Sequence, residues 1–247
     1  MKTFAVAILL VATLLTFSGC ASIARRALFY PTHHDRTNGL NEWREEGVVI
    51  GYSRTVLNPQ TVWLMIHGNG GQAADRAYAL DAFADRDSVY ILEYPGYGTR
   101  RGMPSKQSFD RAATEAFQYL RRTYPTTPVC VVGESIGTGP ASVLARQASP
   151  PGKIVLIVPF DDLKSVAAEH APWLPVKLLL GSSWNNVHAL AGYKGPVDIF
   201  AAEDDAVIPV HHAKALASAV PQARLRILSG GHNEWPLHGA SVRIRNP

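Results

Sequence analysis

Short, continuous apolar runs alternate along the chain with longer segments of mixed polarity. Unbroken apolar runs are typical of strands that helices cover on both faces of a mainly parallel sheet. We expect such strands at residues 61–66, 88–92, 128–132, 153–158, 196–201 and 224–228. The segments between them have helical amphipathic spacing, and we expect crossover helices at residues 73–85, 108–124, 138–147, 163–180 and 210–220. The pattern therefore predicts an α/β fold with a mostly parallel central sheet.

The region before the first of these runs has a weaker pattern. Residues 46–56 indicate an antiparallel strand or hairpin at the sheet edge, and residues 31–45 are expected to form a loop. No Pro/Gly-rich linker divides the rest, and 247 residues suit one domain with a sizeable core. We expect a linker at residues 21–45 and one domain at residues 46–247.

The first 20 residues have the composition of a signal peptide: Lys2, an uncharged apolar stretch at residues 4–17, and small residues before Cys20. A membrane-spanning helix is the alternative, but the stretch is shorter than the roughly 20 residues that a span needs. The FSGC segment ending at Cys20 resembles a bacterial lipobox, with Phe17 where Leu is usual, and the resemblance implies lipidation of Cys20. Cleavage after Ala24 would instead release a soluble protein.

These features predict a membrane-anchored lipoprotein of the bacterial cell envelope, with a secreted or periplasmic soluble protein as the alternative. The net charge is only +4 and no Lys/Arg run exceeds two residues, so the chain lacks the basic footprint of a nucleic-acid-binding protein. The second cysteine is Cys130, and lipidation of Cys20 would leave it without an intrachain disulfide partner.

Candidate catalytic residues follow the apolar runs, as expected for a sheet whose ligands bind beyond the carboxyl ends of its strands. Ser135 lies in VVGESIGTGPA, between a predicted strand and a predicted helix, which is the context of a nucleophile elbow. A serine needs a base that an acid orients. His232, in SGGHNEW, follows the last predicted strand, and Asp204 and Asp205, in AEDDAVIP, follow the strand before it.

Five motifs occur in order: HGNGG at 67–71, EYPGYG at 93–98, GESIG at 133–137, EDDAVIP at 203–209 and GGH at 230–232. Together the motifs resemble the α/β-hydrolase superfamily, in particular its esterase, lipase and serine-peptidase-like branch with a short cap, over about residues 45–238. The resemblance implies that the acid is Asp205, with Asp204 as the alternative and Asp161 or Asp162 as a third candidate whose expected role is helix capping. It also implies an oxyanion hole formed by the amides of Ile136 and Asn69, with Gly70 as the next donor.

Other residues have plainer interpretations. We expect His67 to brace the oxyanion loop, and we expect His211 and His212 to lie on a solvated surface because no metal-ligand spacing accompanies them. Tyr97 is a candidate pocket wall. For Trp173 and Trp184, in the expected cap segment, core packing and lining of an acyl pocket both stay open.

The sequence thus predicts a serine hydrolase that cleaves acyl esters through an acyl-enzyme intermediate, with Ser135, Asp205 and His232 as its triad. No metal or organic cofactor is expected, and the expected partner is an acyl substrate. An amidase, peptidase or thioesterase with the same triad is the alternative within hydrolysis. A non-catalytic envelope lipoprotein that retains the fold is the alternative from another class.

Overall fold

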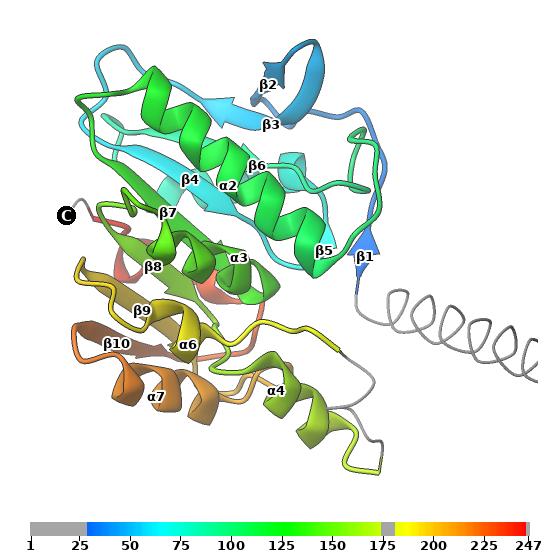
Figure 1. Ribbon diagram of the computed structural model, residues 1–247, viewed down its shortest axis with the longest axis vertical. Helices are drawn as coiled ribbons and strands as arrows, with labels where there is room; N and C mark the ends of the chain where they lie inside the picture. Colours follow the sequence, from blue (N-terminus) through cyan, green and yellow to red (C-terminus); the bar gives the residue numbers. More distant parts are fainter. Residues whose placement is uncertain (1–28, 174–180, 246–247) are drawn as a thin grey trace, which may run out of the picture.

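The computed structural model describes residues 29–173 and 181–245, and its centre is an eight-stranded sheet (Figure 1). The strand order across this sheet is β10-β9-β8-β7-β4-β6-β3-β2. The strands are β2 (Asn41–Glu45), β3 (Val48–Arg54), β4 (Val62–Ile66), β6 (Ser88–Leu92), β7 (Val129–Glu134), β8 (Ile154–Ile157), β9 (Val197–Ala202) and β10 (Ala223–Leu228). A separate two-stranded sheet pairs β1 (Tyr30–Pro31) with β5 (Gly70–Gly71) in parallel.

All neighbouring pairs from β10 to β6 are parallel, which confirms the predicted sheet, and β3 is antiparallel to both β6 and β2. The prediction of a loop at residues 31–45 was wrong for β2. Trp43 is the one buried residue of that strand, and its ring contacts the Tyr90 ring at a centroid distance of 4.9 Å. A single apolar residue among polar ones is too weak a signal for a strand.

The helices cover both faces of the sheet. They are α2 (Lys106–Thr123), α3 (Thr138–Val143), α4 (Leu163–His170), α6 (Asn186–Leu190) and α7 (Val210–Ala219), with 3₁₀ helices η1 (Ala73–Ala82), η2 (Ser135–Gly137), η3 (Leu144–Arg146) and η4 (Trp235–Ser241). The predicted α-helix at residues 73–85 is therefore a shorter 3₁₀ helix. The helix predicted at residues 163–180 ends at His170, and residues 174–180 lie outside the described residues.

Two hydrophobic layers fix these helices to the sheet. On one face, side chains of α2, α3, α6 and α7 pack against β4, β7 and β9; on the other, η1 and η4 pack with residues such as Trp63 and Met65. Every residue of β4, β6, β7 and β8 is buried. Because both faces are covered, these strands have the continuous apolar sequences from which they were predicted.

The expected signal peptide, Cys20 and most of the expected linker lie outside the described residues. Within the described part of the chain, none of the helices combines the length and apolarity that a membrane span requires.

Candidate active site

Ser135 lies at the sharp turn between β7 and the helices that follow it. Its backbone φ is +53°, a left-handed conformation that is rare for a residue with a side chain. The turn needs glycine on both sides of Ser135, because the surrounding atoms leave no room for a Cβ there. A Cβ on Gly133 would lie 2.7 Å from the Ala141 Cβ, and a Cβ on Gly137 would overlap the Ile66 carbonyl. The sequence G-E-S-I-G therefore folds into a strained elbow that presents the Ser135 hydroxyl.

The elbow brings Ser135 to His232, which lies 97 positions further along the chain. The His232 Nε2 is 2.9 Å from the Ser135 Oγ, and its Nδ1 is 2.7 Å from Asp205 Oδ2. His232 follows β10 and Asp205 follows β9. Backbone hydrogen bonds join the two loops, from the Glu203 amide to the Leu228 carbonyl and from the Asp204 amide to the Gly230 carbonyl.

Asp205 is held in place from its other side. Its Oδ1 accepts hydrogen bonds from the amides of Val207 and Ile208, at 2.8 and 2.7 Å, and the residue is 6% exposed. Because an ionised carboxylate only accepts, His232 Nδ1 donates to Asp205, and the His232 Nε2 is then free to accept the Ser135 proton. Asp204, the alternative acid, is exposed, and its side chain makes no hydrogen bond to His232 in the described structure.

Asp161 and Asp162, which were the third candidates for the acid, contact other residues. Asp162 is the N-cap of α4, where its side chain accepts from the Lys164 amide, in agreement with the expected capping role. Asp161 Oδ1 lies 2.7 Å from His212 Nδ1.

The loop at residues 67–71 lies against the elbow. The Gly68 amide donates to Glu134 Oε2 at 2.8 Å. Since Glu134 precedes Ser135 and Gly68 precedes Asn69, this hydrogen bond joins the elbow to the loop that contains Asn69. The Asn69 side chain accepts hydrogen bonds from the Tyr97 hydroxyl at 3.0 Å and the Tyr30 amide at 3.3 Å. Ile136 follows Ser135 directly and is buried at the start of η2. The loop that contains Asn69 thus lies against the turn that contains Ile136, and their role as oxyanion donors stays a prediction.

Glu134 was not singled out from the sequence, although it organises this region. Its carboxylate is buried and accepts from Arg76 Nε at 3.0 Å, Trp235 Nε1 at 3.0 Å and Tyr78 Oη at 3.3 Å. Burial alone would raise the pKa of Glu134, but the Arg76 charge, together with the Trp235 and Gly68 hydrogen bonds, holds that pKa below its ordinary value. The only signal in the sequence was a charged residue inside an otherwise apolar strand and turn.

His67 is fully buried and its Nδ1 lies 2.6 Å from the Gly68 carbonyl, a contact that fits the expected bracing of this loop. Tyr97 is also fully buried and its hydroxyl donates to the Asn69 side chain, and its role as a pocket wall stays a prediction. Trp184 packs in the core and donates to Asp110 Oδ1 at 2.7 Å, whereas Trp173 is 79% exposed. For Trp184, core packing is therefore the observed role.

The prediction that both adjacent histidines lie on a solvated surface was wrong for His212, which is 2% exposed. Its partners, Asp161 and Glu169, come from the segment after β8, more than 40 positions earlier in the chain. Spacing within the local sequence could not reveal contacts from so far away.

A serine in a strained turn after a central parallel strand, with a histidine and an aspartate from later strand ends in hydrogen-bond reach, defines the class of the α/β-hydrolases. Solved structures with this fold are similar: the Pyrococcus furiosus esterase Pf2001 has a TM-score of 0.64 at 15% identity, over 87% of this chain and 97% of that one. An alpha-beta hydrolase from Vibrio vulnificus has a TM-score of 0.59 at 20% identity, over 69% and 67% of the two chains.

Proteins of similar sequence include lipases. The chain is 33% identical over 186 residues to an uncharacterized protein of Mycobacterium tuberculosis, covering 73% of this chain and 66% of that protein. It is 26% identical over 204 residues to the lysophosphatidylserine lipase ABHD12 of Danio rerio, covering 74% and 53%. The chain thus spans 66% of the first relative's length and 53% of the second's. No protein-family model matches the chain. The chain therefore has the α/β-hydrolase fold, and its sequence is similar to those of proteins named as lysophosphatidylserine lipases.

Proposed function

We propose that this protein is a serine hydrolase that cleaves acyl esters with Ser135 as nucleophile, His232 as base and Asp205 as the acid that orients the base. The single observation that carries the proposal is the continuous hydrogen-bonded series from Asp205 through His232 to a strained, buried Ser135. A binding protein would have no need of this arrangement, which argues against the non-catalytic alternative.

In the proposed mechanism, His232 takes the Ser135 proton as the hydroxyl oxygen attacks the acyl carbonyl, and a tetrahedral oxyanion forms. The Ile136 and Asn69 amides stabilise that oxyanion. His232 then protonates the leaving alcohol, leaving an acyl group on Ser135. Water, deprotonated by the same histidine, attacks the acyl group and releases the carboxylic acid and free Ser135.

Lipid esters are the substrate class that the relatives support, because several of them are named as lysophosphatidylserine lipases. The similarity is limited to about half of those proteins. A substrate panel should therefore compare a short-chain ester, a long-chain lysophospholipid, a thioester and an amide. Faster turnover of the amide or thioester than of both esters would replace the ester proposal by the alternative within hydrolysis.

The experiment that tests the proposal is hydrolysis of a short acyl ester by the wild-type chain and by Ser135→Ala. We expect the substitution to abolish turnover. Ser218→Ala is the matched control, because Ser218 is an exposed serine on α7 that bonds only to the Lys214 carbonyl among the described residues. Wild-type turnover by Ser135→Ala would refute the proposal.

We further propose that the mature protein carries a lipid on Cys20 and is held at a membrane of the cell envelope. Support for this comes from the N-terminal sequence alone. Two or more acyl chains give a stable anchor, whereas a single chain of about 14 carbons binds only marginally. The mass of the mature N-terminus tests the proposal: an unmodified chain that starts after Ala24 would contradict it.

A further inference from the structure

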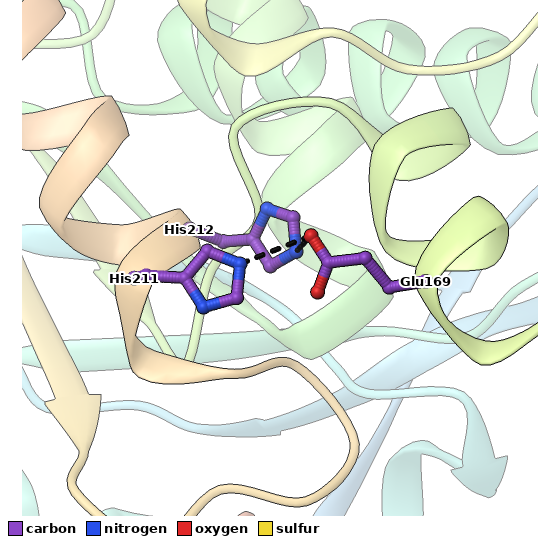
Figure 2. A group of neighbouring side chains, drawn as sticks. All are labelled: Glu169, His211 and His212. Atoms are coloured by element: carbon purple, nitrogen blue, oxygen red, sulfur yellow. Dashed lines mark hydrogen bonds and ion pairs between the residues drawn. The ribbon is translucent and has the colours of Figure 1, made fainter.

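A second group of titratable side chains lies away from Ser135, between the end of α4 and the start of α7. Glu169 comes from the last turn of α4, and His211 and His212 are the second and third residues of α7. Figure 2 shows the Glu169 carboxylate beside the two neighbouring imidazole rings, with one of its oxygens facing both. His211 Nε2 is 3.0 Å from Glu169 Oε1, and His212 Nε2 is 3.2 Å from the same oxygen.

His212 is held in one tautomer by a carboxylate behind it. Its Nδ1 lies 2.7 Å from Asp161 Oδ1, an oxygen that also accepts from the Asp162 amide. A carboxylate accepts and does not donate, so the His212 Nδ1 carries a proton, and in the neutral ring the Nε2 then presents a lone pair. A carboxylate that fixes a histidine in this way is the usual outer partner of a metal-binding imidazole.

The His212 Nε2 is a buried polar atom that needs a partner. It has no hydrogen bond in the described structure, although the residue is 2% exposed and the Glu169 carboxylate lies close by. An unprotonated nitrogen that faces a carboxylate oxygen is repulsive, and an unsatisfied buried polar atom is costly. A cation between the two atoms would remove both penalties.

The spacing of the three ligand atoms suits a small divalent metal ion. Zinc bonds of about 2.0 Å at tetrahedral angles place neighbouring ligand atoms about 3.3 Å apart. The two nitrogen-to-oxygen distances are 3.0 and 3.2 Å, and all three atoms lie within 4.8 Å of one another. The side chains of His211 and Glu169 are 59% and 45% exposed, so solvent has access for a fourth ligand.

We propose that Glu169, His211 and His212 form a binding site for a divalent transition metal of the zinc type. Two imidazoles and one carboxylate favour zinc and its neighbours over Mg²⁺ or Ca²⁺, which prefer sets of oxygen ligands. The carboxyl end of α4 favours a cation electrostatically, and the amino end of α7 opposes it, so the site depends on its ligands. A bound ion would tie α4 to α7, which begins directly after the Asp205 loop.

Calorimetric titration of the full-length chain, without a polyhistidine tag, with Zn²⁺ tests this site. We expect one equivalent to bind, and excess Mg²⁺ not to compete. His211→Ala and Glu169→Gln remove exposed ligands, and we expect each to weaken Zn²⁺ binding at least tenfold, on the order of the loss seen when a metal site is perturbed. His188→Ala is the matched control, since His188 is an exposed histidine on another helix.

Asp161→Asn tests the outer partner separately, because it leaves all three ligand atoms in place. We expect Zn²⁺ affinity to fall by about 10- to 100-fold. Zn²⁺ should also raise the melting temperature of the wild-type chain and of His188→Ala but not of His211→Ala. Wild-type Zn²⁺ affinity in His211→Ala and Glu169→Gln, or the lack of any saturable binding by the wild-type chain, would overturn the proposal.

Discussion

Two carboxylate–histidine pairs lie after neighbouring parallel strands, and they share one kind of contact. Asp205 and His232 are joined at 2.7 Å, and so are Asp161 and His212, each through the histidine Nδ1. The pairs differ in what the second ring nitrogen faces. His232 Nε2 faces the Ser135 hydroxyl at 2.9 Å, whereas His212 Nε2 faces the Glu169 carboxylate at 3.2 Å.

In each pair the carboxylate sets only the tautomer of the histidine, whereas the third partner sets the chemistry of its second ring nitrogen. A hydroxyl can give up a proton to the ring and become a nucleophile. A carboxylate that is already ionised has no proton to give, and its pairing with a ring nitrogen calls for a cation. The same pair of residue types therefore supports a catalytic proposal at one strand end and a metal-binding proposal at the next.

The largest effect should come from removing the third partner of the first pair. We expect Ser135→Ala to lower kcat for ester hydrolysis by about 10⁶-fold, because His232 and Asp205 have no function without the nucleophile. Steady-state kinetics with Ser218→Ala as control measures this. A loss below tenfold would place the nucleophile elsewhere.

One substitution in each pair distinguishes the role of the Asp205 carboxylate from that of the Asp161 carboxylate. Asp205→Asn should lower kcat by about 10⁴-fold, because an amide stabilises the wrong tautomer of His232. The same variant should keep Zn²⁺ affinity close to the wild-type value, in contrast to Asp161→Asn. Asp204→Asn, at the exposed neighbouring position, is the control for kcat. Equal losses in Asp204→Asn and Asp205→Asn would contradict the assignment of the acid.

An ion pair between Glu134 and Arg76 lies next to Ser135, the third partner of the first pair. Glu134→Gln leaves Arg76 without its charged partner and loosens Gly68, so we expect a loss in kcat of about 10- to 100-fold with little change in KM. We expect unfolding to become easier by about 3 kcal/mol, the cost of breaking a buried pair. Glu203→Gln, at an exposed site, is the control in both kinetics and denaturant unfolding. A change in KM alone would argue against a positioning role.

The smallest expected effect is on pH dependence. Because the folded-state pKa of Glu134 is lowered, its contribution to stability is present above the unfolded pKa of about 4.3 and is lost as the pH falls through the folded value. The free energy of unfolding of the wild-type chain should therefore decline more steeply below about pH 4.3 than that of Glu134→Gln. Parallel declines would show that Glu134 does not contribute this dependence.

Local sequence was enough to predict the parallel strands, since both faces of strands such as β4 and β7 are buried and, apart from Glu134 at the end of β7, every residue in these two strands is apolar or small. It also placed Ser135, Asp205 and His232 at strand ends, where the structure brings them together. It missed β2, whose edge position leaves only Trp43 buried, and the roles of Glu134 and His212. Those roles depend on partners such as Arg76 and Asp161, which only the tertiary fold brings close.

The central claim is that Ser135 is the nucleophile, and a fluorophosphonate probe tests it most directly. Mass spectrometry of the labelled wild-type chain should locate one adduct, on the peptide that contains Ser135, because the probe reacts with a serine that an adjacent base activates. Ser135→Ala should carry no adduct, and Ser218→Ala should be labelled like the wild type. An adduct on a different residue, or full labelling of Ser135→Ala, would contradict the account.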